Sequence, residues 1–305
     1  MALSEKAQAM KKMMRENNMR AIFNDREAFD NFVKQMGELQ SKPYVMPESV
    51  CEQVNVEVFE TSGGAKVYTF TPLEGVENDI NVIYYHGGGF VAELGEMSWP
   101  GYIRIANKLR CAVTIPSYRQ VPTNGWHETY ADAMDTYRHV LETHAPEKVA
   151  FIGESAGGHL VLAAAVLAKM EGLPQPGLLI PMSPWSDFAN ILPGKREMAE
   201  TDLLLGWISM SELPQMWAPD LWDKEEFPVN LFYADFEGLA PTIVTAGGEE
   251  MLLPDADLIV DKLKKAGVDV EYHVAEGMWH AFVGMPNIPE CEDMMAYLLD
   301  KISKL

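Results

Sequence analysis

The stretch VAFIGESAGGHL, at residues 149–160, turns from a strand-forming run into a helix-forming run within a few residues. Residues 149–152 are typical of a buried strand, and residues 156–170 have the composition of a helix. The junction reads Gly153-Glu154-Ser155-Ala156-Gly157 and fits the pattern G-x-S-x-G, in which a sharp strand-to-helix turn projects the serine hydroxyl. Glycine is needed two positions before and after the serine, because side chains there would collide with backbone. The stretch therefore predicts a nucleophile, Ser155, at the end of a sheet strand.

Strand and helix patterns alternate through most of the chain. We expect strands at 54–59, 65–71, 80–85, 111–116, 149–152, 178–181, 242–246 and 268–274, and helices at 4–38, 102–109, 128–143, 156–170, 256–266 and 291–302. This alternation predicts βαβ units and a mostly parallel central sheet. The first two strands are joined by Ser62-Gly63-Gly64, a tight turn that predicts an antiparallel edge.

Residues 185–235 interrupt the alternation. The segment holds four tryptophans and several prolines but no clear strand, and it is longer than a simple connection. Two interpretations are open: a packed structural excursion, or a lid over a pocket formed together with the Met-rich N-terminal helices. Methionine suits a lid because its flexible side chain adapts to varied apolar shapes.

Composition narrows the function. The 305 residues carry 45 acidic and 24 basic side chains, a formal net charge of −21, which disfavours nucleic acid and anionic lipid and favours a small neutral ligand. No apolar run has the length of a membrane span, and the charged N-terminus lacks a secretory core. Three widely spaced cysteines form neither a disulfide framework nor a zinc site. We therefore expect a cytoplasmic protein without membrane insertion and without a bound metal.

A serine nucleophile needs a base and an acid. His280 lies in the glycine-containing loop EGMWHAFVG after the last expected strand, where a parallel sheet presents its functional groups. By contrast, His127, His139, His144 and His159 lie on or beside expected helices, and His273 lies inside an expected strand. The loop after residues 242–246 offers three acids, Glu249, Glu250 and Asp255. The chain order serine, acid, histidine is the one expected for this kind of fold. The residues alone leave the choice of acid open.

The stretch YYHGGGF, at residues 84–90, places three glycines after a strand. When Ser155 attacks an ester carbonyl, negative charge develops on the oxygen and is stabilised by fixed N–H groups. We expect these donors from Gly87, Gly88 and Ala156, because a bare backbone lets the substrate approach closely. The glycine run is therefore interpreted as an oxyanion hole.

Taken in this order, the motifs YYHGGGF, SYRQVP, GESAGG, SPWSD and GMWHAF resemble the hormone-sensitive-lipase-like branch of the α/β-hydrolases, a family of microbial carboxylesterases. The likeness covers the chain from about residue 40 to the C-terminus. It implies an α/β-hydrolase fold with an eight-stranded, mostly parallel sheet flanked by helices, and no cofactor. It also implies a helical cap made of residues 1–40 and 185–235, over a catalytic domain made of residues 41–184 and 236–305.

Two segments depart from the family pattern. Where the family often has Asp-Pro-Leu, this chain reads GGEEMLLPDA; relatives with a similar segment place the acid at the second acidic position, which implies Glu250 ahead of Asp255 and Glu249. The loop SYRQVPTNGWHE keeps Tyr118, Arg119 and Pro122 but lacks the acidic residue that usually follows the proline. By the resemblance, His86 anchors the glycine loop and transfers no proton.

The resulting expectation is a serine carboxylesterase that hydrolyses short- to medium-chain acyl esters through an acyl-enzyme. The same triad would serve an amidase, an arylformamidase or a small-peptide hydrolase. A non-catalytic binding protein is disfavoured because Ser155 and His280 are both present, and a metal hydrolase lacks its signature, such as HExxH. Relatives often form dimers, so we also expect a homodimer, with the strand at 268–274 as a candidate edge.

Overall fold

The computed structural model describes residues 2–42 and 44–305 and is built on one eight-stranded sheet. The strands are β1 (Val54–Glu60), β2 (Lys66–Pro72), β3 (Asn81–Tyr85), β4 (Ala112–Pro116), β5 (Val149–Glu154), β6 (Leu178–Met182), β7 (Thr242–Gly247) and β8 (Val270–Ala275). Their order across the sheet is β1-β2-β4-β3-β5-β6-β7-β8. β1 and β2 pair antiparallel, as do β2 and β4, and all other neighbours are parallel. The expected sheet and its antiparallel edge are confirmed.

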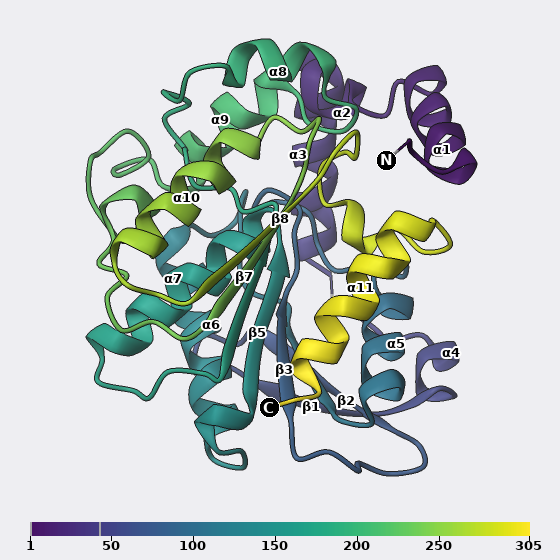
Figure 1. Cartoon of the computed structure of the whole chain (residues 1–305), viewed down its shortest axis with the longest axis vertical. Helices are drawn as coiled ribbons and strands as arrows, with labels where there is room; N and C mark the ends of the chain where they lie inside the picture. Colours follow the sequence, from purple (N-terminus) through teal and green to yellow (C-terminus); the bar gives the residue numbers. More distant parts are fainter. Residues whose placement is uncertain (1, 43) are drawn as a thin grey trace.

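Helices cover both faces of this sheet (Figure 1). The helices are α1 (Glu5–Glu16), α2 (Ala21–Asn24), α3 (Arg26–Gln40), α4 (Glu48–Cys51), α5 (Trp99–Leu109), α6 (Trp126–Leu141), α7 (Ala156–Met170), α8 (Lys195–Thr201), α9 (Trp207–Trp217), α10 (Leu253–Lys265) and α11 (Pro289–Ile302), with short 3-10 turns η1 (Pro146–Lys148), η2 (Leu231–Tyr233) and η3 (Phe282–Gly284). α6, α7 and α10 lie on one face, and α5 and α11 on the other. Each face buries its own apolar cluster, as expected for a parallel sheet covered on both sides.

The N-terminal region differs from the single helix expected at residues 4–38. It forms three helices, because α1 ends at Glu16, is followed by Asn17 as its C-cap, and Asn18 adopts a left-handed φ of 45°. The chain is extended again at Asp25, whose side chain accepts a hydrogen bond from the Ala28 N–H and starts α3. Helical spacing of apolar residues was a correct indication of helix, but it did not reveal these two interruptions.

The segment between β6 and β7 contains α8, α9 and η2. In Figure 1, α8 and α9 lie with α2 and α3 at the top of the molecule, beyond the carboxyl ends of the parallel strands. Part of the segment belongs to the main apolar cluster: the Trp217 ring stacks on Phe90 with centroids 3.9 Å apart, and Trp185 is buried beside them. The segment is therefore a packed layer of the structure.

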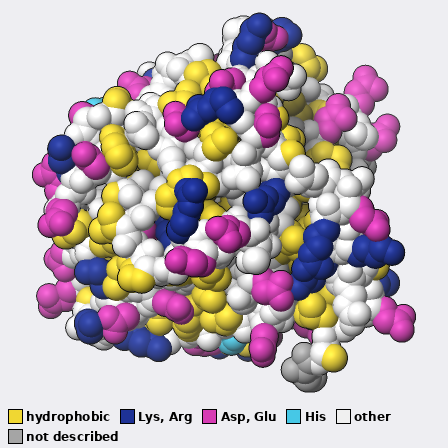
Figure 2. All heavy atoms as spheres, turned by 90° about the horizontal axis from the view of Figure 1, so that it is seen from above, with side chains coloured by type: hydrophobic (Ala, Val, Ile, Leu, Met, Phe, Trp, Pro, Cys, Tyr) yellow, Lys and Arg dark blue, Asp and Glu magenta, His cyan; other side chains and the backbone are white. Residues whose placement is uncertain are grey.

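Charged side chains are distributed over the face seen from above, where acidic groups alternate with Lys and Arg (Figure 2). The overall charge of −21 therefore belongs largely to a solvated surface. Within residues 2–42 and 44–305, no helix combines the length and apolar character needed to cross a bilayer.

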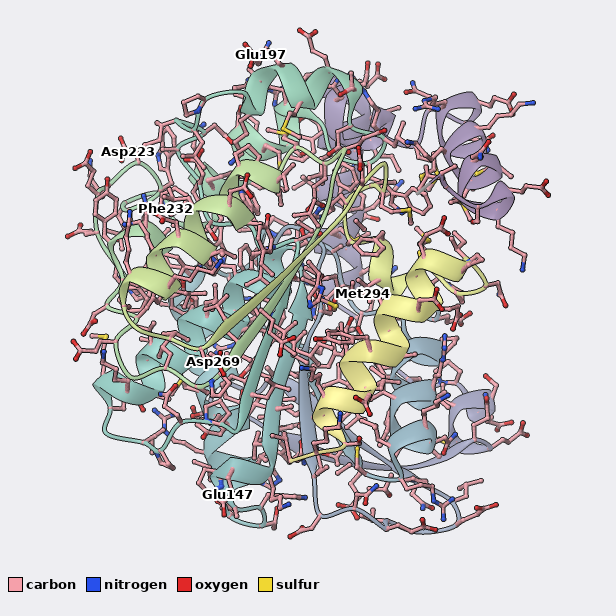
Figure 3. All side chains as sticks on the ribbon, in the orientation of Figure 1. Glu147, Glu197, Asp223, Phe232, Asp269 and Met294 are labelled. Carbon is pink, nitrogen blue, oxygen red and sulfur yellow. The ribbon has the colours of Figure 1, made fainter. Side chains whose placement is uncertain are left out.

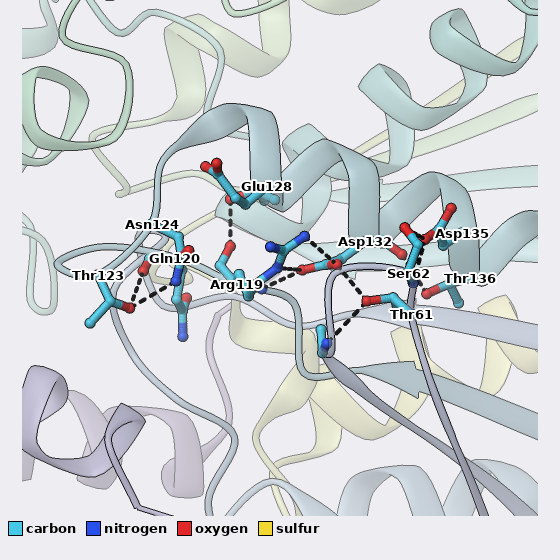
Figure 4. Close-up of polar contacts among 12 residues, drawn as sticks. Thr61, Ser62, Arg119, Gln120, Thr123, Asn124, Glu128, Asp132, Asp135 and Thr136 are labelled. Atoms are coloured by element: carbon cyan, nitrogen blue, oxygen red, sulfur yellow. Dashed lines mark hydrogen bonds and ion pairs between the residues drawn. The ribbon is translucent and has the colours of Figure 1, made fainter.

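A buried polar network anchors the loop that follows β4 (Figure 4). The Asp132 carboxylate is fully buried and accepts hydrogen bonds from the Arg119 backbone N–H and Nε, both at 2.9 Å. Arg119 Nη2 donates to the other oxygen at 3.0 Å, and Thr61 Oγ1 donates to it at 2.7 Å. The network joins α6, the hairpin between β1 and β2, and the loop after β4, so this loop has a structural role.

Removing this carboxylate should destabilise the fold. We expect Asp132→Ala to lower the free energy of unfolding by about 3 kcal/mol, because it leaves the Arg119 guanidinium without its charged partner. Urea denaturation measures the change. Asp261→Ala, at an exposed ion pair with Lys265, is the control and should change stability by about 0.5 kcal/mol or less. Equal effects of the two substitutions would contradict the account.

Candidate active site

Ser155 stands at the turn between β5 and α7 in a strained backbone conformation, with φ of 58° and ψ of −118°. The turn can be this tight because Gly153 and Gly157, two positions before and after Ser155, have no side chain and pack directly against the backbone at the end of β3. A Cβ on Gly157 would lie 1.9 Å from the Tyr85 carbonyl oxygen, and one on Gly153 would lie 2.5 Å from the same atom. No side chain fits at either position. The Ser155 side chain is held at the carboxyl edge of the sheet and is 8% exposed.

His280 lies in the loop after β8, and its ring is buried against Glu250 from the loop after β7. His280 Nδ1 and Glu250 Oε2 are 2.7 Å apart, and Glu250 Oε1 accepts the Gly247 N–H at 3.1 Å. An ionised carboxylate only accepts, so the Nδ1 proton is donated to Glu250 and Nε2 is left for another partner. Burial alone would lower the pKa of His280, but the hydrogen bond and the charge of Glu250 outweigh it and raise this pKa.

The end of β6 and the residue that follows it connect the serine turn to the histidine loop. The Ser155 N–H donates to the Met182 carbonyl at 2.9 Å. One residue further, Ser183 Oγ accepts the N–H of Ala281 at 3.1 Å, and Ala281 follows His280 in the chain. Ser155 and the residue after His280 thus bind to adjacent residues, Met182 at the end of β6 and Ser183 at the start of the SPWSD motif, although β5 and β8 are not neighbouring strands.

The other two candidate acids have different partners. Glu249 Oε2 forms an ion pair with Lys11 Nζ of α1 at 2.7 Å. Asp255 is buried next to Lys195, at 3.0 Å, and accepts the N–H groups of Ser186 and Asp187; burial raises the pKa of Asp255 to about 6. Of the three acids considered from the sequence, Glu250 is the one that contacts His280.

Two further histidines near the site are buried and neutral. Burial lowers the pKa of His159 to about 3; its Nε2 contacts the Tyr130 hydroxyl at 2.7 Å and its Nδ1 the Trp185 carbonyl at 2.9 Å. Burial likewise lowers the pKa of His86 to about 4, and its ring stacks on Tyr118 with centroids 4.2 Å apart. Their partners are structural groups, so neither histidine is a candidate base.

The glycine loop needs glycine at its second and third positions. Gly88 and Gly89 have φ of 112° and 65°, which other residues rarely adopt. A Cβ on Gly89 would also lie 2.8 Å from Leu213 Cδ1, so α9 packs directly against this loop. Among the described residues, none accepts a hydrogen bond from the N–H groups of Gly88, Gly89 or Ala156.

Gly87 is different, and the expectation that it supplies an oxyanion donor conflicts with the structure. Its N–H already donates to Glu154 Oε1 at 2.8 Å. That donor would have to leave a carboxylate before it could bind a substrate oxygen. The free donors are those of Gly88, Gly89 and Ala156, so Gly89 replaces Gly87 in the candidate set.

Glu154 is a further candidate residue of the site, which the sequence does not single out although it stands inside the GESAGG motif. It precedes Ser155 and holds the start of the glycine loop, a contact between residues 67 positions apart. Desolvation raises the pKa of Glu154, while its hydrogen bonds oppose that rise. No local pattern in the sequence could have revealed this pairing.

A cavity of about 410 Å³ adjoins the site on the side of α5 and α11. Its lining includes Glu154 and Ala281, the chain neighbours of Ser155 and His280, together with mainly apolar side chains: Met97, Ile105, Val283, Met285 and Met295. No group of three or more His, Cys, Asp or Glu side chains in residues 2–42 and 44–305 is arranged to hold a metal ion.

Comparisons with known proteins agree with this architecture. A family profile described as the alpha/beta hydrolase fold matches residues 82–284. The chain is 31% identical over 225 residues to the carboxylesterase/phospholipase LipF of Mycobacterium tuberculosis, covering 68% of this chain and 58% of that protein. It is 26% identical over 204 residues to an esterase of Acinetobacter venetianus, covering 66% of this chain and 67% of that protein.

A solved structure, described as an esterase from the bacterial hormone-sensitive lipase family, matches with a TM-score of 0.80 and 27% identity, over 100% of this chain and 99% of that chain. The family match spans the strand before the glycine loop, the serine turn and the histidine loop, which are the parts that build the site. This chain belongs to the hormone-sensitive-lipase-like family of α/β-hydrolase carboxylesterases.

Proposed function

We propose that this protein is a serine carboxylesterase that hydrolyses short- to medium-chain acyl esters through an acyl-enzyme intermediate. The observation that carries the proposal is the buried His280–Glu250 pair, 2.7 Å apart, in a loop joined through Ser183 to the segment that holds Ser155. A buried imidazole oriented by a carboxylate is what a serine hydroxyl needs to become a nucleophile at neutral pH.

The reaction follows from these positions. Ser155 Oγ attacks the ester carbonyl while His280 Nε2 takes its proton, and Glu250 stabilises the imidazolium that forms. The N–H groups of Gly88, Gly89 and Ala156 stabilise the oxyanion, each donor contributing about 3 kcal/mol. His280 then returns the proton to the leaving alcohol. Water, deprotonated by His280, attacks the acyl-enzyme and releases the acid and the Ser155 hydroxyl.

The surroundings support a small neutral ester as the substrate. The apolar cavity beside Glu154 and Ala281 offers room for one arm of the ester. Residues 185–235, together with the N-terminal helices, would form the cap, because α9 packs against the glycine loop through Leu213 and α2 and α3 lie next to α8 and α9. The limited size of the cavity, about 410 Å³, favours short and medium acyl chains over long ones.

Ser155→Ala should abolish the activity. We expect p-nitrophenyl acetate and butyrate to be hydrolysed faster than the hexadecanoate, and kcat to fall on the order of 10⁶-fold in the variant. A fluorophosphonate probe should label the wild type and not Ser155→Ala. The exposed Ser303→Ala is the matched control and should behave as wild type. Preference for the longest ester would refute the proposed chain length of the substrate. Faster cleavage of a matched anilide would refute the preference for esters. Labelling of Ser155→Ala by the probe would refute the assignment of Ser155 as the nucleophile.

The pH profile tests His280 and Glu250 together. The base must be neutral, so kcat/KM should fall as the pH drops through the His280 pKa, which Glu250 raises above the ordinary value of 6.5. Glu250→Gln removes that charge; it should shift the acidic limb to lower pH and reduce kcat by about 10⁴-fold. Glu276→Gln, an exposed change in the loop before His280, should alter neither. Near-normal turnover of Glu250→Gln would assign the acid elsewhere.

A further inference from the structure

Asp202, at the end of α8, is a buried carboxylate that the proposed reaction does not use. It is 1% exposed, and both of its oxygens accept hydrogen bonds from backbone N–H groups. Oδ1 accepts from Leu204 and Leu205, each at 2.8 Å, within its own turn. Oδ2 accepts from Met251 at 2.7 Å, which lies 49 residues further along the chain. The segment between β6 and β7 is thus tied to the loop after β7.

The position of the hydrogen bond between Met251 and Asp202 is significant because Met251 directly follows Glu250. The Glu250 side chain is already fixed by the Gly247 N–H before it and by the His280 ring. Asp202 fixes the backbone on the other side of Glu250. Since Oδ1 is held by its own turn, Asp202 cannot swing away to follow a shifted loop, and the loop that carries the acid is held from both sides.

Asp202 also places a second negative charge near the acid–base pair. The carboxylates that face His280 come from three elements: Glu250 after β7, Asp202 at the end of α8 and Glu154 at the end of β5. All three favour the protonated imidazole and thus raise the pKa of His280, Glu250 most strongly and Asp202 next. This effect belongs to the charge of Asp202 and is separate from its hydrogen bond to Met251.

The N-terminal helices hold Asp202 in place in turn. Arg20, just before α2, donates from Nη1 to the carbonyl oxygens of Ala199 at 3.2 Å, Glu200 at 2.6 Å and Asp202 at 3.4 Å. A cation at the carboxyl end of a helix is favourable because the last carbonyls lack helical partners. A continuous chain of contacts therefore runs from the N-terminal helices through α8 to Met251 and Glu250.

We propose that Asp202 is a positioning residue that couples the seating of the 185–235 segment to the alignment of the Glu250–His280 pair. The inference rests on the proposed esterase function. It assigns to the segment a role beyond covering the pocket: when the segment is seated, the acid loop is held in its working position. Displacement of α8 would release Met251 and loosen Glu250.

Asp202→Asn is the most direct test. Asparagine keeps the shape but replaces one acceptor oxygen with an NH₂ group, which must then face an N–H donor. With p-nitrophenyl acetate, we expect kcat to fall about 10- to 100-fold with little change in KM, because the acid–base pair is misaligned while the substrate pocket is intact. The acidic limb of kcat/KM should also move to lower pH, since a charge that raises the His280 pKa is removed.

The matched control is Asp223→Asn, the same substitution in the same segment at an exposed side chain, which projects from the outer edge of the molecule in Figure 3. It should leave kcat and the acidic limb of the kcat/KM–pH profile unchanged. If the folded Asp202→Asn variant has the kcat of the wild type and its acidic limb of kcat/KM lies at the same pH, the proposal is overturned. A kcat loss that follows a loss of folded protein, with the limb unmoved, would also overturn it, because that pattern indicates a purely structural residue.

Arg20→Gln keeps the proposal testable if Asp202→Asn does not fold. This change loosens the end of α8 but retains the Asp202 charge, so kcat should fall by a smaller factor while the acidic limb stays where it is in the wild type. Unchanged kcat in Arg20→Gln would overturn the coupling. Ser155→Ala measured alongside separates the two ideas: if it stays active, the esterase mechanism fails whatever the Asp202 and Arg20 variants show.

Discussion

The close approach of the serine turn to the end of β3 is the constraint on which the site depends. Gly157 lies so near the Tyr85 and His86 carbonyls that a Cβ would sit 1.9 Å and 2.6 Å from their oxygens. Because the glycine loop begins at His86, this contact places the proposed oxyanion donors beside the proposed nucleophile. Glu154 completes the junction by binding the Gly87 N–H. The strain at Ser155 is tolerated because the surrounding backbone leaves the turn no other path.

A group of three carboxylates near His280 is the second feature on which the site depends. Glu250, Asp202 and Glu154 all act on one imidazole, and each carboxylate is itself bound to a backbone N–H group. Desolvation raises the pKa of Glu250 and of Glu154, and the hydrogen bonds that these two carboxylates accept oppose that rise. The N–H groups that bind these carboxylates belong to Gly87 in the glycine loop and to Gly247 and Met251 on either side of Glu250. The carboxylates that raise the pKa of His280 therefore also fix the positions of these two loops.

The sequence predicted the sheet, its antiparallel edge, and the placement of Ser155 and His280 at loops on its carboxyl edge, because each rests on a local pattern. Glu250 could be preferred over Glu249 and Asp255 only through the family resemblance, since all three are acids in one short stretch and their partners, His280, Lys11 and Lys195, are distant in the chain.

What the sequence did not reveal has two physical origins. The sequence makes Gly87 a reasonable oxyanion donor, but its N–H donates to the distant Glu154, and Asp202 belongs to no sequence motif. The single N-terminal helix became three because Asn18 and Asp25 interrupt it, and apolar spacing is insensitive to such single-residue changes of backbone conformation. Contacts between distant residues decided the first two cases, and local backbone conformation decided the third.

The central claim is that the serine, the imidazole and the free loop amides surround one reacting atom. A crystal structure of the protein inactivated by a small alkyl phosphonate tests it most directly, because the tetrahedral phosphorus imitates the intermediate. We predict phosphorus on Ser155 Oγ, a phosphoryl oxygen within hydrogen-bonding distance of the Gly88, Gly89 and Ala156 N–H groups, and the Gly87 N–H still bound to Glu154. A phosphoryl oxygen held by Gly87, or an adduct out of reach of His280, would contradict the account.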